Sequence, residues 1–149
     1  RGQALGVELT TRLEGFQARL AEAGGELTGE FVATGELTIE SGYSAAGQML
    51  RAERRPAAIF CGNDLMAYGA YRRCAELGLR VPDDVALFGF DDNPLNDWLA
   101  TWLSTVRVPY DRFGPATAQV IRQILSETTA RAAHDDVVLP FQMTIRASA

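Results

Sequence analysis

The sequence contains no lysine, because all 14 of its basic residues are arginines. This absence excludes a Walker-type phosphate loop, a Schiff-base lysine and a lysine general base. Histidine and cysteine are also scarce: His134, Cys61 and Cys74 are too few for a zinc cluster or a disulfide framework. We therefore expect no metal site, and the two cysteines are compatible with a reducing cytosol.

Long hydrophobic runs are missing as well. No apolar stretch approaches the roughly 20 residues that a membrane-spanning helix needs, and Arg1 does not begin a secretory signal. The formal net charge of -5 repels phosphates, so this chain is not expected to bind DNA through its own charge. Its 149 residues, 47% of them hydrophobic, suit one domain, or one lobe of a larger domain, with a buried core.

Four helices are predicted from capping residues and apolar spacing. Thr11-Arg12-Leu13-Glu14 fits a capping box and predicts a helix that stops at Gly24-Gly25. Thr38 is the predicted N-cap of a second helix, and a third runs from about Asp64 to Gly78. The fourth is predicted by an apolar stripe at helical spacing, formed by Phe113, Val120, Ile121, Ile124 and Leu125.

Strands are predicted between these helices. Ala57–Cys61 is a continuous apolar run, as expected of a strand buried on both faces. The other predicted extended segments are Leu27–Ala33, Val85–Phe90, Leu103–Val108 and Val137–Ile145. Ser126–Asp136 resembles a polar connection. Strands that alternate with helices indicate an α/β fold with a doubly wound, Rossmann-like parallel sheet.

Polar side chains follow two of these strands at their carboxyl ends, where open α/β sheets bind ligands. Asn63 and Asp64 follow the second predicted strand, and Asp91 and Asp92 follow the third. Short polar residues are also common helix N-caps, so capping and ligand contact both remain open. For Asp64 we favour the cap.

Arg12 lies in the first turn of its predicted helix, where the helix dipole disfavours a cation. This position is compatible with a ligand or carboxylate partner, and also with an ordinary surface arginine.

Several sequence motifs occur one after another along the chain. They are Arg12-Leu13-Glu14-Gly15-Phe16, Cys61-Gly62-Asn63-Asp64-Leu65-Met66-Ala67-Tyr68-Gly69-Ala70, Val81-Pro82-Asp83-Asp84-Val85 and Gly89-Phe90-Asp91-Asp92. In combination they closely resemble the ligand-binding domain of the LacI/GalR family of transcriptional repressors, and the match runs nearly end to end. The resemblance implies the second subdomain of a periplasmic-binding-protein-like (type I) fold.

The resemblance also implies how the chain is divided. Residues 1–107 and 137–149 would form the C-terminal effector-binding subdomain, and residues 108–136 would return to an N-terminal subdomain. The remainder of that subdomain and a helix-turn-helix headpiece would lie upstream of Arg1. By the same resemblance we expect a cytoplasmic homodimer that contacts operator DNA only through the headpiece.

Carried over by motif position, Arg12, Asn63 and Asp91 match the family's effector-binding residues. A guanidinium, a carboxamide and a carboxylate suit a sugar or related polyol, and also a nucleoside or purine. Tyr110 falls where the family often has a ring near the ligand. Leu37 falls where many members place a stacking aromatic, so that platform is reduced or supplied elsewhere.

Other residues near these positions have two interpretations. Trp98 and Trp102 could replace the missing aromatic, but core packing is an equally good explanation for each. Asp92 is interpreted as an organiser of its loop rather than a ligand contact. Cys61, inside a strand, is expected to behave as a small hydrophobe.

Two other functions are considered. A periplasmic sugar-binding protein shares the fold and the polyol chemistry. The motifs Val81-Pro82-Asp83-Asp84-Val85 and Gly89-Phe90-Asp91-Asp92, together with the two cysteines, favour a cytosolic regulator. A phosphoacceptor enzyme using Asp64 or Asp91 would usually need a lysine partner, which this chain lacks. We therefore expect no enzymatic activity and no cofactor.

Overall fold

The computed structural model describes residues 3–51, 54–126 and 136–149, with side chains of the first helix from Thr10 onward. His134 and nearly all of the predicted connection Ser126–Asp136 lie outside the described residues. The elements are α1 (Gln3–Glu22), a 3-10 turn (Gly29–Phe31), α2 (Ile39–Met49), β1 (Ala58–Phe60), α3 (Asp64–Glu76), β2 (Ala86–Asp91), α4 (Asn96–Leu99), β3 (Ser104–Arg107), α5 (Tyr110–Ser126) and β4 (Gln142–Thr144).

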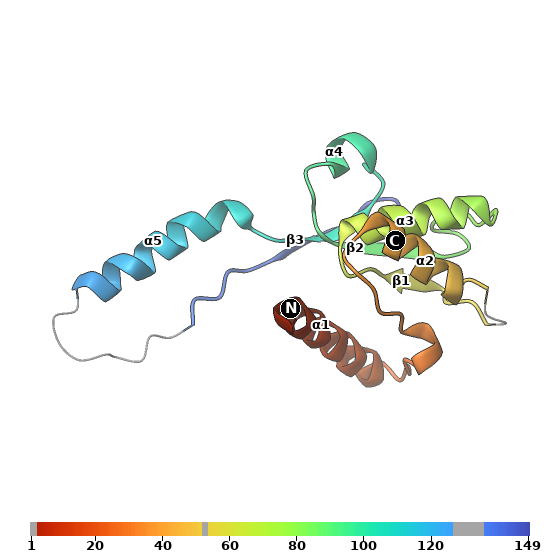
Figure 1. Cartoon of the computed structure of the whole chain (residues 1–149), viewed down its shortest axis with the longest axis horizontal. Coiled ribbons are helices and arrows are strands. Elements are labelled where there is room, and N and C mark those ends of the chain that lie inside the picture. The colour runs from red at the N-terminus through yellow and green to blue at the C-terminus, as the bar shows by residue number, and fades with distance from the viewer. Residues whose placement is uncertain (1–2, 52–53, 127–135) are drawn as a thin grey trace.

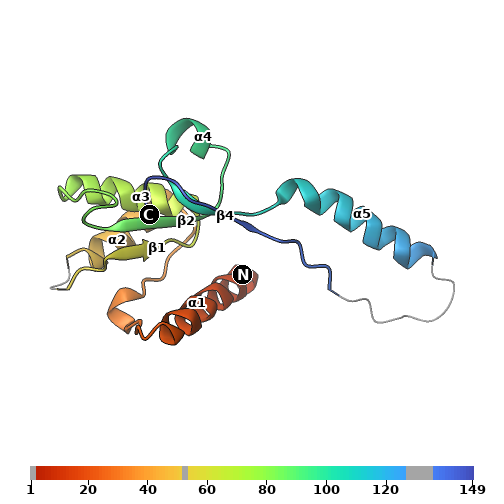
Figure 2. The same ribbon diagram turned by 180° about the vertical axis from the view of Figure 1, so that it is seen from behind.

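The sheet has the strand order β1-β2-β3-β4. The first three strands are parallel, because α3 and α4 each carry the chain back to the start of the next strand. β4 is antiparallel to β3 and lies at the edge of the sheet, where the segment after residue 136 runs back from the side of α5 (Figure 2). The predicted α/β fold with a mainly parallel sheet is confirmed, and its last strand departs from the parallel pattern.

The two faces of the sheet are covered by different helices. Phe60 and Phe88 lie on the face toward α1, where Phe16 contacts Phe60 with a ring separation of 5.7 Å. Ile59 and Leu87, one residue out of phase, face the core that α2 and α3 complete. The prediction that Ala57–Cys61 is buried on both faces is wrong, because α1 covers its face incompletely and Phe60 remains 36% exposed.

The helices α2 and α3 approach each other closely because glycines face the contact. A β-carbon at Gly69 would lie 2.0 Å from the carbonyl oxygen of Ile39, and one at Gly42 would lie 2.2 Å from that of Met66. Such distances leave no room for a side chain. The close contact brings the start of α3, with its polar residues, against the core of the sheet.

Two predicted helix starts have opposite outcomes. The start at Thr11 is wrong: α1 begins at Gln3, so Thr11 and Arg12 lie well inside the helix rather than in its first turn. The N-cap at Thr38 is confirmed, since its side chain accepts a hydrogen bond from the backbone N–H of Ser41. The predicted stop is also confirmed, because α1 ends at Glu22 and Gly24 adopts a φ of +79°.

The predicted strand Leu27–Ala33 is wrong. The segment contains only the 3-10 turn Gly29–Phe31, and β1 is the edge strand of the described sheet. Gly29 inside the segment disfavours an extended chain, and the polar Glu30 interrupts its apolar pattern.

The helix α5 and the extended segment after residue 136 project from the sheet as an arm (Figures 1 and 2). α5 contributes no buried residue, and Ile121, Ile124 and Leu125 of the predicted stripe are exposed. Beyond β4 the chain returns to the sheet, where the Ser148 hydroxyl donates to the Leu87 carbonyl at 2.6 Å. No helix in the described ranges is long and apolar enough to cross a membrane.

The contact between α2 and α3 predicts a specific destabilisation. Gly69→Ala should lower the free energy of unfolding by about 1–3 kcal/mol, because the added methyl group overpacks the interface. Gly15→Ala is the matched control within α1, where a β-carbon meets nothing within 4 Å. That control should leave stability unchanged or raise it by up to ~1 kcal/mol through helix propensity. Urea unfolding measures both, and equal effects would contradict the close contact.

Candidate functional site

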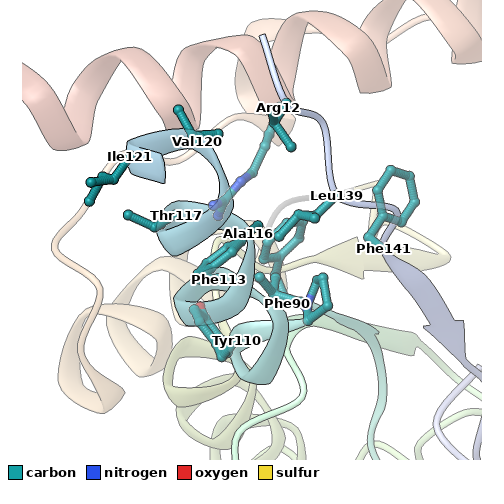
Figure 3. A pocket seen from close by; sticks show the side chains of 13 residues that line it. Arg12, Phe90, Tyr110, Phe113, Ala116, Thr117, Val120, Ile121, Leu139 and Phe141 are labelled. Atoms are coloured by element: carbon teal, nitrogen blue, oxygen red, sulfur yellow. The ribbon is translucent and has the colours of Figure 1, made fainter. Parts of the chain in front are cut away.

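A pocket of about 580 Å³ opens beside the carboxyl ends of β2 and β3. Figure 3 shows Arg12 reaching from α1 into the space between α5 and the return segment. The lining is mainly apolar and consists of Arg12, Phe90, Val108, Pro109, Tyr110, Phe113, Ala116, Thr117, Val120, Ile121, Val137, Leu139 and Phe141. Its position agrees with the expectation that ligands bind at this edge of an open α/β sheet.

Arg12 is held from two sides. Its guanidinium carbon lies 3.7 Å from the centre of the Phe90 ring, and its Nη1 donates to the Gly62 carbonyl at 3.0 Å. A cation over an aromatic face contributes about 0.5–2 kcal/mol, depending on how dry the contact is. Arg12 is therefore not a free surface charge, and its guanidinium is oriented toward the pocket.

Asp91 ends β2, next to Phe90 of the pocket lining, but does not itself line the pocket. Its Oδ1 accepts a hydrogen bond from the Tyr110 hydroxyl at 3.0 Å. Burial raises the pKa of the Asp91 carboxyl above its ordinary value, with a further increase from the charge of Asp64. The Tyr110 hydrogen bond and the charge of Arg12 oppose that rise in pKa. Asp91 is thus a partly desolvated acceptor with a cation nearby.

Tyr110 begins α5 and is 58% exposed. Its ring meets Phe113 edge-on at a centroid distance of 5.6 Å, so the two form an apolar wall. Burial raises the pKa of the Tyr110 phenol, and the hydrogen bond to Asp91 raises it further because ionisation would remove the donated proton. The structure therefore brings three predicted residues together: Arg12, Asp91 and Tyr110.

Asn63 and Leu37 form a separate cluster. Asn63 caps α3, with its Oδ1 accepting from the Met66 N–H at 2.9 Å, and its Nδ2 donates to the Leu37 carbonyl at 3.2 Å. Asn63 is only 7% exposed, and neither residue lines the pocket. The two clusters meet at Gly62, whose carbonyl accepts from Arg12. Ligand contact by Asn63 and Leu37 stays a prediction.

The capping interpretation of Asp64 is wrong, because Asn63 occupies the N-cap position. Asp64 is instead buried and accepts hydrogen bonds from Thr105, Asn93 and Asn96. No motif in the sequence indicated these partners, which come from separate segments of the chain.

Asp92 organises its loop, as interpreted. Its Oδ1 lies 2.9 Å from Nη2 of Arg146, and it also accepts from the Asn96 amide at 3.3 Å. Sequence reasoning missed Arg146 as a partner, because the residue lies 54 positions further along the chain.

Neither tryptophan lines the pocket. Trp102 stacks on Tyr71 at 4.0 Å and packs against the core, which confirms the packing interpretation for this residue. Trp98 is 84% exposed on α4, so core packing is wrong there. The rings beside Arg12 belong to Phe90 and Phe113 instead. Cys61 is buried in the core, and burial raises the pKa of its thiol to about 12, in agreement with a small hydrophobe.

Comparison with known proteins gives a consistent result. The profile of the periplasmic binding protein-like domain matches residues 7–149. The HTH-type transcriptional repressor PurR of Yersinia enterocolitica is 40% identical over 117 residues, which cover 78% of this chain and 34% of that protein. The chain therefore spans about a third of the length of the curated relatives it matches.

Two solved structures extend the comparison. A regulatory protein of the LacI family from Chloroflexus aggregans superposes with a TM-score of 0.82 at 33% identity, covering 92% of this chain and 49% of that one. A LacI family transcriptional regulator from Arthrobacter sp. FB24, in complex with lactose, superposes with a TM-score of 0.76 at 30% identity. It covers 88% of this chain and 47% of that one.

The raised pKa of Asp91 predicts how stability depends on pH. A carboxyl whose pKa is higher in the folded than in the unfolded protein destabilises the fold when it is ionised. This destabilisation is complete above the folded-state pKa and disappears below the unfolded-state pKa. Asp91→Asn should therefore raise the melting temperature of the unliganded protein at pH 7. The difference from wild type should shrink as the pH is lowered through the carboxyl titration. Asp136→Asn, at an exposed position, is the control and should change the melting temperature little.

Proposed function

The chain belongs to the LacI/GalR effector-binding domains of the periplasmic binding protein-like family, and from this membership we propose that it binds a small polyhydroxylated molecule, most simply a sugar. The proposal rests on one observation: Arg12 and Tyr110 line one pocket at the carboxyl edge of the sheet, and Asp91 is hydrogen-bonded to Tyr110. The lactose complex of the Arthrobacter relative supports a sugar as the ligand class.

The chemistry of the three side chains fits adjacent hydroxyl groups. The Asp91 carboxylate accepts hydrogen bonds from hydroxyls, and the Arg12 guanidinium donates to oxygen through a planar fork. Tyr110 and Phe113 supply an apolar wall for the face of a sugar ring. The same aromatic lining would accept the base of a nucleoside, so that class is included in the test.

We propose that α5 and the return segment 137–141 pack against a second lobe. The observation that supports this is the uncovered apolar stripe on α5, together with Phe141 and Leu139 along the opposite side of the pocket. Enclosure between two lobes excludes water from the ligand. Each polar contact is then stronger, because water no longer competes for the same hydrogen bonds. This proposal corresponds to the expected return of residues 108–136 to an N-terminal subdomain.

In the intact protein, we propose, ligand binding changes the affinity for operator DNA and involves a cytoplasmic homodimer. A ligand shifts such an equilibrium only by its different affinities for the two states. The printed names of the relatives, which are repressors and regulators, support regulation over transport or catalysis.

The experiment is a thermal-shift screen of the intact protein, followed by calorimetry on each compound that raises the melting temperature. The panel contains lactose, ribose, other mono- and disaccharides, sugar phosphates and nucleosides. Stabilisation by a sugar supports the proposal, and stabilisation by nucleosides alone moves the assignment to that class. A protein that none of these compounds stabilises would contradict it.

Asp91→Ala should weaken binding of the sugar identified in the screen by about tenfold to a hundredfold. Hydrogen bonds to a charged group contribute about 1.5–3 kcal/mol, which corresponds to that range. Asp97→Ala removes an exposed carboxylate on α4; it is the matched control and should bind like wild type. Calorimetry decides, and unchanged affinity in a folded Asp91→Ala protein would remove Asp91 from the site.

Arg12→Lys should also weaken binding, even though the charge is kept. Lysine lacks the planar fork of donors, and its ammonium stacks less well over the Phe90 ring. Arg19→Lys is the control on the same helix, at an exposed position. The melting temperatures of both variants should stay near that of wild type. Equal affinity of Arg12→Lys and wild type would show that only the charge of Arg12 matters.

A further inference from the structure

The carboxylate of Asp64 is buried and accepts hydrogen bonds from the connection that follows β2. The residue is 1% exposed at the start of α3. Its Oδ1 accepts from the Thr105 hydroxyl at 2.6 Å, and its Oδ2 accepts from the Asn93 N–H at 2.7 Å and the Asn96 amide at 2.8 Å. Thr105 belongs to β3, whereas Asn93 and Asn96 belong to the connection that follows β2. The carboxylate therefore ties α3, β3 and this connection together.

The sheet leaves space for this carboxylate. A β-carbon at Gly89 would lie 2.2 Å from Oδ1 of Asp64, so only glycine at this position of β2 lets the side chain reach Thr105. Thr105 is itself fully buried, and its oxygen also accepts from the backbone N–H of Asp92 at 3.4 Å. Asp64 thus holds the loop directly at Asn93 and through Thr105 at Asp92.

The backbone conformation is unfavourable at the two residues where the loop begins. Asp91 has a φ of 110° and Asp92 a φ of 51°, both in the region that favours glycine. Two successive residues of this kind persist only where the surroundings over-determine them. The anchors at Asp92 and Asn93 follow directly after Asp91, so they set the direction in which its side chain leaves the strand.

We infer that Asp64 is a positioning residue of the ligand site, which acts through Thr105 and the loop to aim the Asp91 carboxylate at Tyr110 and the pocket. It does not touch the ligand itself. The inference rests on the proposed function of Asp91 as a ligand acceptor. It adds a buried pair, Asp64 and Thr105, that determines the geometry of that acceptor.

Thr105→Val tests this inference without any ligand. The substitution keeps the shape of the buried side chain but removes the hydroxyl that links Asp64 to Asp92, while the bonds of Asp64 to Asn93 and Asn96 remain. Released from its anchor, Asp91 should lose its hydrogen bond with Tyr110, and the pKa of the Tyr110 phenol should fall toward that of an exposed tyrosine. The pKa is measured by ¹³C NMR of ring-labelled tyrosine in the intact protein, with the resonance assigned from Tyr110→Phe.

Two further variants separate positioning from general stability. Thr105→Ser restores a hydroxyl and should restore the wild-type pKa of Tyr110. Thr144→Val makes the same chemical change on β4, at the register partner of Thr105, and should leave that pKa unchanged. Asp64→Ala removes the acceptor of all three donors and should lower the Tyr110 pKa further than Thr105→Val does, because it also removes a charge that raises this pKa directly.

A folded Thr105→Val protein in which Tyr110 titrates as in wild type would overturn the inference. A Thr105→Val protein that does not fold would overturn it equally, because the hydroxyl would then hold the core rather than the loop. Neither result depends on a ligand. A failed ligand screen therefore contradicts the proposed function and leaves the result of the Tyr110 titration unaffected.

Discussion

A buried carboxylate constrains the carboxyl edge of this sheet, because a charge removed from water must be satisfied by the protein. The donors that satisfy Asp64 come from β3 and from the connection after β2, so these segments have to meet at one point. Gly89 is required beneath the carboxylate, and Asn96 also links it to Asp92. The arrangement of strands, helix start and loop at this edge follows from one unavoidable requirement for hydrogen bonds.

Local features of the candidate site destabilise the fold, and favourable packing elsewhere offsets that free energy. Asp91 combines a left-handed backbone with a carboxyl whose pKa burial raises, and Arg12 is taken from solvent to lie over Phe90. Both features of Asp91 disfavour the unliganded protein, whereas the contact of Arg12 with the Phe90 ring is favourable. The close glycine contact between α2 and α3 and the dense core behind the sheet provide the rigid support.

The C-terminal segment connects the arm to the loop after β2. From the pocket wall at Leu139 the chain runs through β4 to Arg146, which pairs with Asp92, and ends with Ser148 bonded to β2 and β3. A displacement of the arm would therefore be felt at the loop that carries Asp91. In the proposed two-lobed protein, this continuous set of contacts would connect the arm with the loop after β2.

The sequence by itself determined the features that depend on neighbouring residues. The cap at Thr38, the stop at Gly24, the third helix and the alternation of strands and helices were all predicted, because caps, glycine turns and apolar period are local properties. The motif order also identified the family and selected Arg12, Asp91 and Tyr110, which the structure brings together.

Only the tertiary structure decided features that depend on partners distant in sequence. The true start of α1, the exposure of Phe60 and the loss of a strand near Gly29 depend on which neighbouring elements cover each segment. The N-cap of α3 is Asn63 rather than the expected Asp64 for the same reason. Either residue type can cap a helix, and only the donors supplied by β3 and the loop after β2 decide which one is buried.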